Sequence, residues 1–160
     1  MSPDNRIDPL QIIPTSPQLT AVIPITVRRE EIRKVMGPGL AELKAELAAQ
    51  NIAVTGPWFA HHVRHPGETF DFEICLPVAK TVAPSGRVQP GLWPAMTVVR
   101  TTYHGNYEGL GAAWGEFLEQ INVAGLKTAG DLWERYVVGP EASADPAAWQ
   151  TELSKPLVGT

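Results

Sequence analysis

Gly130–Val138 reads GDLWERYVV, a run with the composition of a β-strand. Side chains alternate between the two faces of a strand, so Leu132, Glu134, Tyr136 and Val138 share one face. That face is aromatic and aliphatic except for one carboxylate. A buried carboxylate is costly unless it is paired, hydrogen-bonded or able to meet a ligand. Taken alone, the run also fits a solvent-exposed sheet edge, or an ion pair between Glu134 and a nearby arginine.

The same run has a counterpart earlier in the chain. Three pairs of segments match in the same order and with similar spacing: 56–63 with 130–137, 73–78 with 152–157, and 19–22 with 96–99. The matches predict an internal duplication. At its centre, Glu134 corresponds to Ala60 and Tyr136 to His62. A core built only for packing has little use for a charge in one copy and a methyl group in the other, which favours a functional role for Glu134.

Apolar periodicity gives the same order of elements twice: strand, helix, strand, strand. Helices are expected over about 32–47 and 107–121. The first is kinked or divided by Gly37-Pro38-Gly39, and the second is capped by Asn106 and stopped by Gly125. Pro24 predicts an edge, a bulge or a strand end. The expected strands are 19–27, 54–64, 69–78, 93–103, 130–138 and 149–157, with a turn at 65–67 and a loop over 82–90.

The predicted fold class is therefore α+β. Two βαββ units, about 19–80 and 92–158, form one antiparallel sheet with both helices on one face and a ligand cleft at the seam. Residues 1–18 are expected to be an extended N-terminal arm, and 19–160 a single domain.

Composition narrows the classes of function. The 160 residues carry a net charge of -4 without a Lys/Arg cluster, so direct nucleic-acid binding is not expected. No apolar run resembles a signal peptide or a membrane span. The single cysteine, Cys75, suits a reducing compartment, and the chain is expected to be a cytoplasmic protein without membrane contact.

The sequence gives weaker support for a metal site, a cysteine nucleophile or a dinucleotide-binding site. His61, His62, His65 and Glu73 suggest a metal site, but His61 and His62 point to opposite strand faces, so no metal is expected. Cys75 shares a predicted face with acidic residues, which disfavours a thiolate nucleophile. Gly pairs within the second helix lack a dinucleotide-binding context, and no cofactor is expected.

Three short motifs resemble the GyrI-like small-molecule-binding family, a duplicated βαββ fold of SOUL-like type. They are Tyr103–Leu110 at a strand-to-helix turn, Trp133–Tyr136, and Thr151–Leu157. The family includes the effector-binding domains of AraC-type and MerR-type regulators. No DNA-binding helices precede Leu19, so the resemblance implies a free-standing member.

The resemblance implies a central aromatic pocket that takes bulky, hydrophobic and often cationic molecules, with Glu134 as acidic anchor. Aromatic faces and a desolvated carboxylate both favour a cation. The ligand-binding candidates are Met36, Phe72, Tyr103, Trp114, Trp133, Glu134 and Tyr136, of which Trp133 is turned away from Glu134 by strict alternation.

Two alternatives remain open. Some free-standing members hydrolyse strained, cyclopropane-bearing genotoxins. In that case Glu134 would activate water and a tyrosine, Tyr136 or Tyr103, would donate a proton or hydrogen bond. A protein-interaction or inhibitor module would instead need an exposed apolar patch.

Overall fold

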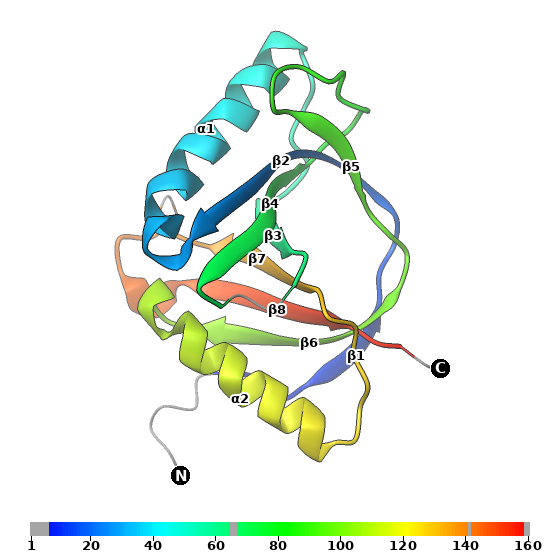
Figure 1. Cartoon of the computed structure of the whole chain (residues 1–160), viewed down its shortest axis with the longest axis vertical. Helices are drawn as coiled ribbons and strands as arrows, with labels where there is room; N and C mark the ends of the chain where they lie inside the picture. Colours follow the sequence, from blue (N-terminus) through cyan, green and yellow to red (C-terminus); the bar gives the residue numbers. More distant parts are fainter. Residues whose placement is uncertain (1–6, 65–66, 141, 159–160) are drawn as a thin grey trace.

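One curled antiparallel sheet with two helices on one face makes up the described part of the chain, residues 7–64, 67–140 and 142–158 (Figure 1). The structure is a computed structural model. The helices are α1 (Ile32–Ala49) and α2 (Leu110–Val123). The strands are β1 (Gln11–Pro14), β2 (Gln18–Arg28), β3 (Phe59–His62), β4 (Thr69–Pro77), β5 (Gln89–Trp93), β6 (Thr97–His104), β7 (Leu132–Val138) and β8 (Gln150–Pro156). The fold class predicted from the sequence is confirmed.

The strand order β1-β6-β8-β7-β3-β4-β2-β5 reveals the duplication. Three strands flank the central β3–β7 pair on each side: two belong to the half on that side, and the outermost, β5 or β1, comes from the other half. Gln11 pairs with Arg100 and Val22 with Gln89, so a shift of 78 residues carries 11 to 89 and 22 to 100. The same shift carries the first residue of α1, Ile32, onto the first residue of α2, Leu110.

The centre of the sheet bears out the alignment made from the sequence. Ala60 pairs directly with Glu134, its own counterpart in the repeat, so an approximate two-fold axis passes through this pair. The alignment of 19–22 with 96–99 is wrong by one residue. Val22 corresponds to Arg100 and not to Val99, because Val22 and Arg100 face away from the helices whereas Val99 packs under α2.

The elements differ from the prediction in four places. Residues Gln11–Pro14 of the expected arm form edge strand β1, and the expected strand 93–103 is split between β5 and β6 at Pro94. The strand expected over 54–64 is regular only over Phe59–His62. Helix α1 continues through Pro38 without division. Of the expected turn at 65–67, His65 and Pro66 lie outside the described residues, and so does that histidine of the metal candidate.

Other local signals are confirmed. Pro24 lies beyond the end of the β2–β5 pairing, on a locally open edge of β2. The Asn106 side chain accepts a hydrogen bond from the Gly109 N–H and caps the turn that leads into α2. Gly125, with φ +74°, follows the end of α2.

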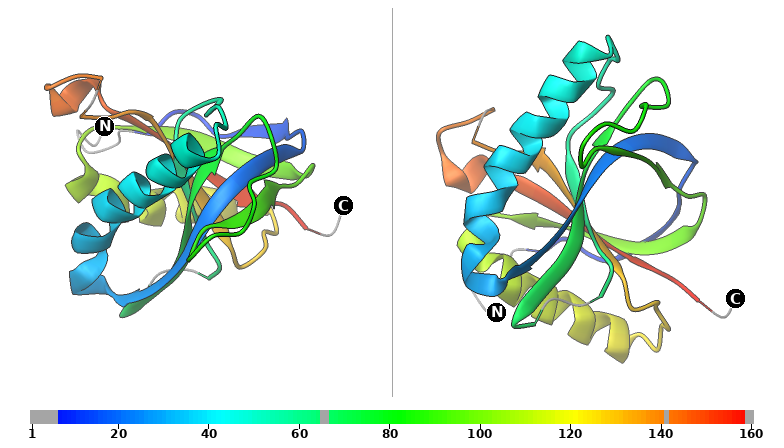
Figure 2. Two further views of the ribbon diagram at one scale, coloured as in Figure 1. Left: turned by 90° about the horizontal axis from the view of Figure 1, so that it is seen from above. Right: turned by 45° about the horizontal axis from the view of Figure 1, so that its top comes forward.

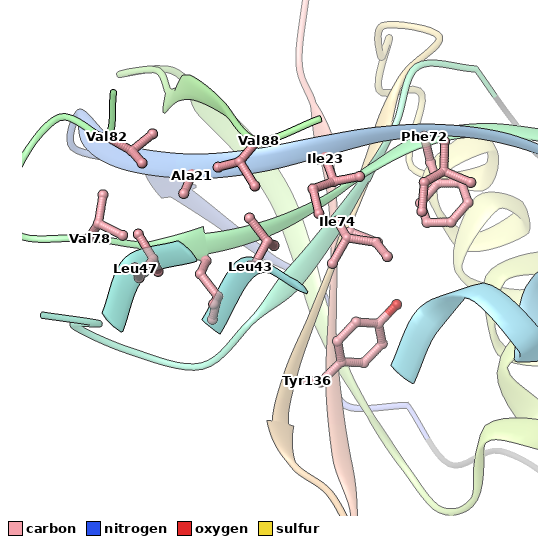
Figure 3. Close-up of a cluster of buried hydrophobic side chains, with 13 residues drawn as sticks. Ala21, Ile23, Leu43, Leu47, Phe72, Ile74, Val78, Val82, Val88 and Tyr136 are labelled. Carbon is pink, nitrogen blue, oxygen red and sulfur yellow. The ribbon is translucent and has the colours of Figure 1, made fainter. Parts of the chain in front are cut away.

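Three clusters of buried side chains hold the layers together. Leu43 and Leu47 of α1 pack on the β2–β4 half of the sheet, and Figure 3 shows this cluster with Tyr136 at its end. Trp114 and Phe117 of α2 pack on the other half. A third cluster lies on the opposite face: Val22, Phe59, Cys75, Trp93 and Trp133.

The connections β1–β2 and β5–β6 arch over that opposite face, away from both helices (Figure 2). They are joined at Thr15, whose hydroxyl donates to the Pro94 carbonyl at 2.8 Å and accepts from the Met96 N–H at 3.1 Å. Among the described residues, neither helix is long and apolar enough to cross a membrane.

Candidate functional site

The Glu134 carboxylate lies on the helix-covered face, at the centre of the sheet. The Trp114 indole N–H donates to one of its oxygens at 2.5 Å, and the Tyr136 hydroxyl donates to the other at 2.9 Å. Glu134 is 9% exposed, and no ion pair joins it to any side chain that the structure describes. The carboxylate is therefore held by two neutral aromatic donors, and no cationic side chain among the described residues pairs with it.

The strand neighbours of Glu134 are apolar. It pairs with Ala60 on one side and with Leu153 on the other, and Ala60 in turn pairs with Ile74. These residues offer no hydrogen bond to the carboxylate from their side chains. Among the described residues, the two aromatic donors are the only side chains that hydrogen-bond to this carboxylate, and each oxygen retains further lone-pair positions for a ligand.

Tyr136 links the carboxylate to an aromatic cluster at one end of the seam. Its ring lies 4.7 Å from Trp58 and 5.9 Å from Tyr107, and Tyr107 lies 5.0 Å from Trp149. Trp58, Tyr107 and Trp149 are half-buried. Burial, strengthened by the adjacent Glu134 carboxylate, raises the pKa of Tyr136 well above its ordinary value, so the phenol keeps its proton.

The sequence candidates divide between the two faces of the sheet. Trp114, Glu134 and Tyr136 are brought into direct contact. Met36, the counterpart of Trp114 under the 78-residue shift, is half-buried on α1 and packs against the first cluster. Phe72 lies in the same cluster, its ring 5.1 Å from that of His62.

Trp133 faces the other way, as alternation requires, and stacks between His61 at 3.8 Å and Trp93 at 4.3 Å. The sequence candidates did not include Trp58 or Trp149. Trp58 directly precedes β3 and lies beside Tyr136. Extending the strand alternation of β3 back by one residue would have placed Trp58 on the same face as Ala60, and so would have identified it as a candidate.

Tyr103 stabilises the strand-to-helix turn that leads into α2, the helix on which Trp114 lies. Its hydroxyl donates to the Asn106 carbonyl at 2.8 Å, and its ring packs under α2. Gly109 lies directly against this hydroxyl, so a Cβ there would overlap it. The contact fixes the start of the helix that delivers Trp114.

Gly109→Ala is expected to destabilise the protein by about 1–3 kcal/mol, because the added methyl group must displace a buried tyrosine. Gly111→Ala is the matched control, since a Cβ there meets nothing within 4 Å and alanine favours the helix. Urea unfolding of both variants measures the difference. Equal stabilities would show that Tyr103 does not anchor the turn.

His61 lies at the seam on the opposite face, between two carboxylates. Its Nε2 is 2.8 Å from Asp131 and its Nδ1 is 3.3 Å from Glu73. Burial lowers the pKa of His61, but the hydrogen bonds and charges of Glu73 and Asp131 outweigh burial, and the pKa is raised. Burial also raises the pKa of the Cys75 thiol, with a contribution from Glu73, which opposes a nucleophilic role as expected.

The raised pKa of His61 makes one part of the stability depend on pH. A protonated His61 stabilises the fold fully below the unfolded-state pKa of about 6.5, and this contribution is lost as pH rises through the higher folded-state pKa. The difference in unfolding free energy between wild type and His61→Gln should therefore shrink as pH is raised from below 6.5. A difference that is constant or grows with pH would contradict the assignment.

Comparison with protein-family models and with curated protein sequences finds no match. Comparison with solved structures finds several. The crystal structure of the EcmrR C-terminal domain has a TM-score of 0.82 at 20% identity, over 95% of this chain and 98% of that chain. In the cryo-EM structure of EcmrR with DNA, the TM-score is 0.81 at 20% identity over 97% of this chain, which spans only 59% of that chain.

Two further structures are similar over nearly their whole length. SAV2435 bound to tetraphenylphosphonium has a TM-score of 0.63 at 10% identity, with 95% of each chain covered. A hydrolase from Listeria innocua has a TM-score of 0.62 at 11% identity, with 93% of this chain and 91% of that chain covered. This chain has the GyrI-like fold. In this structure, Glu134 lies in the central β3–β7 strand pair, on the face that the two helices cover.

Proposed function

We propose that the protein binds bulky hydrophobic cations at the helix-covered seam, with Glu134 as the anionic anchor. The observation that carries this proposal is the buried carboxylate with two neutral donors and no counter-charge among the described side chains. Burying an ion without a partner is costly, and the interaction between opposite charges is strongest where water is excluded. A cationic ligand would supply the missing charge.

The surrounding side chains suit the apolar part of such a ligand. Trp58, Tyr107 and Trp149 are half-buried beside Tyr136 and offer ring faces to a cation or to its aromatic substituents. Met36, on helix α1, adds a flexible and polarisable surface that can adapt to ligands of different shape. The binding of tetraphenylphosphonium by SAV2435, a protein of the same fold, supports this class of ligand.

A pair of ligands that differ in charge but little in shape tests the proposal. Methyltriphenylphosphonium is a cation, and triphenylphosphine oxide is a neutral molecule with the same three rings. Isothermal titration should show that the cation binds at least ten times more tightly, a difference of about 1.4 kcal/mol. Equal affinities would mean that the carboxylate is not the anchor, and absence of binding by either would favour the interaction-module alternative.

A hydrolase is the second candidate, favoured by the direct Glu134–Tyr136 contact. A carboxylate that orients water beside a phenol that retains its proton is a general base beside a general acid. The similar fold of the Listeria innocua hydrolase supports this reading. Incubation with a cyclopropane-bearing electrophile, followed by mass spectrometry, should then detect a product heavier by one water. Tyr136→Phe should abolish that product, and its persistence would exclude Tyr136 as the acid.

A further inference from the structure

The face of the sheet opposite the helices contains a cavity of about 320 Å³. Its walls are the β1–β2 connection, the segment before β3, and side chains of the central strands. Phe59 and Trp93 line it, with their rings 4.9 Å apart and edge to face. The volume is at the lower end of the range for small-molecule sites, enough for a ligand of one or two rings.

Two arginines line this cavity, and none of the described residues that line it is acidic. Arg135 donates to Glu152 at 2.7 Å. Arg100 Nε donates to the Ser154 hydroxyl at 2.9 Å and lies 3.3 Å from Glu152. One carboxylate therefore faces two guanidinium groups, and the cluster carries one unbalanced positive charge.

Arg100 has hydrogen-bond donors that are available to a ligand. Its side chain is only 16% exposed, and its Nε contacts leave both terminal nitrogens without a partner among the described residues. Burial, together with the nearby Arg135, lowers the pKa of Arg100, and Glu152 only partly offsets this. A guanidinium presents its terminal donors in a fixed fork that matches a carboxylate.

We propose that this cavity binds a small aromatic carboxylate, whose anionic group is held by Arg100 and whose ring contacts Phe59 and Trp93. The site is separate from the cation site at Glu134 and does not depend on it. Glu134 and Arg135 are adjacent in β7, and alternation points them to opposite faces of the sheet. The two sites thus favour ligands of opposite charge.

Binding of 2-naphthoate, with the neutral amide 2-naphthamide as its isostere, tests this proposal. The wild-type protein should bind the acid at least ten times more tightly than the amide. Arg100→Gln should remove at least tenfold of the affinity for the acid. Arg87→Gln is the matched control, because Arg87 pairs with Glu42 at an exposed site away from the cavity. The Arg87→Gln variant should bind 2-naphthoate with the same affinity as wild type.

The indole N–H signals in a proton–nitrogen NMR spectrum locate the bound acid. Single Trp→Phe variants assign the Trp93 and Trp114 signals. The Trp93 signal should shift on titration with 2-naphthoate, and the Trp114 signal should not, because Trp114 lies on the other face. Equal binding of acid and amide, no saturable binding, or a shift confined to Trp114 would overturn the proposal. The acid–amide comparison in wild type decides even if Arg100→Gln fails to fold.

Discussion

Phe117→Ala should lower the free energy of unfolding by about 3–5 kcal/mol. The Phe117 ring is 0% exposed and forms the centre of the α2 contact with the sheet. Its counterpart in the first half is Gly39, where α1 approaches Ile74 so closely that a Cβ would overlap that side chain. The two helices therefore meet the sheet in different ways, and α2 depends on this ring to fill the space.

Val123→Ala is the matched control for Phe117→Ala, since Val123 is in the same helix and is 78% exposed. Val123→Ala should change the free energy of unfolding by no more than about 0.5 kcal/mol. Urea unfolding measures both variants. A small effect of Phe117→Ala would mean that α2 is held to the sheet by other contacts, and the position of Trp114 over Glu134 would lose its structural basis.

Glu134→Gln should weaken binding of methyltriphenylphosphonium at least tenfold, about 1.4 kcal/mol. The amide keeps the shape of the side chain but carries no charge. Its oxygen can accept the hydrogen bond from the Trp114 N–H, and its NH2 group can donate to the Tyr136 hydroxyl oxygen. Binding of triphenylphosphine oxide should change much less. Folding should survive, because the substitution removes an uncompensated buried charge.

Glu119→Gln is the matched control for Glu134→Gln, since it removes the same charge from an exposed position on α2. Its affinity for the cation should equal that of wild type. If Glu134→Gln lost stability while cation binding was unchanged, Glu134 would be a structural group. If the cation lost affinity equally in both variants, the attraction would come from net charge and not from a specific anchor.

The sequence was informative where the periodicity was strong. The alternation in β7 and β4, the caps at Asn106 and Gly125 and the duplication of the central strands all followed from the order of residues. The first-strand alignment failed by one residue because β-branched and aliphatic residues occupy both faces of β2, which is buried on both sides. Similarity of side chains cannot fix the register of such a strand.

The site was only partly predictable for a related reason. Strand alternation placed Glu134 and Tyr136 on one face, but the indole donor comes from α2, and no sequence pattern specifies which helix residue reaches which strand. The exchange of β1 and β5 between the halves was also missed, because short edge strands rich in proline and glycine resemble loops. The cavity behind the sheet depends on this exchange, and so it was not foreseen.

A crystal of the complex with tetraphenylarsonium tests the central claim most directly, because the arsenic atom gives an anomalous signal that marks the cationic centre. A cation anchored by Glu134 predicts one strong peak on the helix-covered face, within about 6 Å of the aromatic rings around Tyr136. The peak should disappear in crystals of Glu134→Gln treated in the same way. A peak on the opposite face, or one that persists at full height in Glu134→Gln, would contradict the claim.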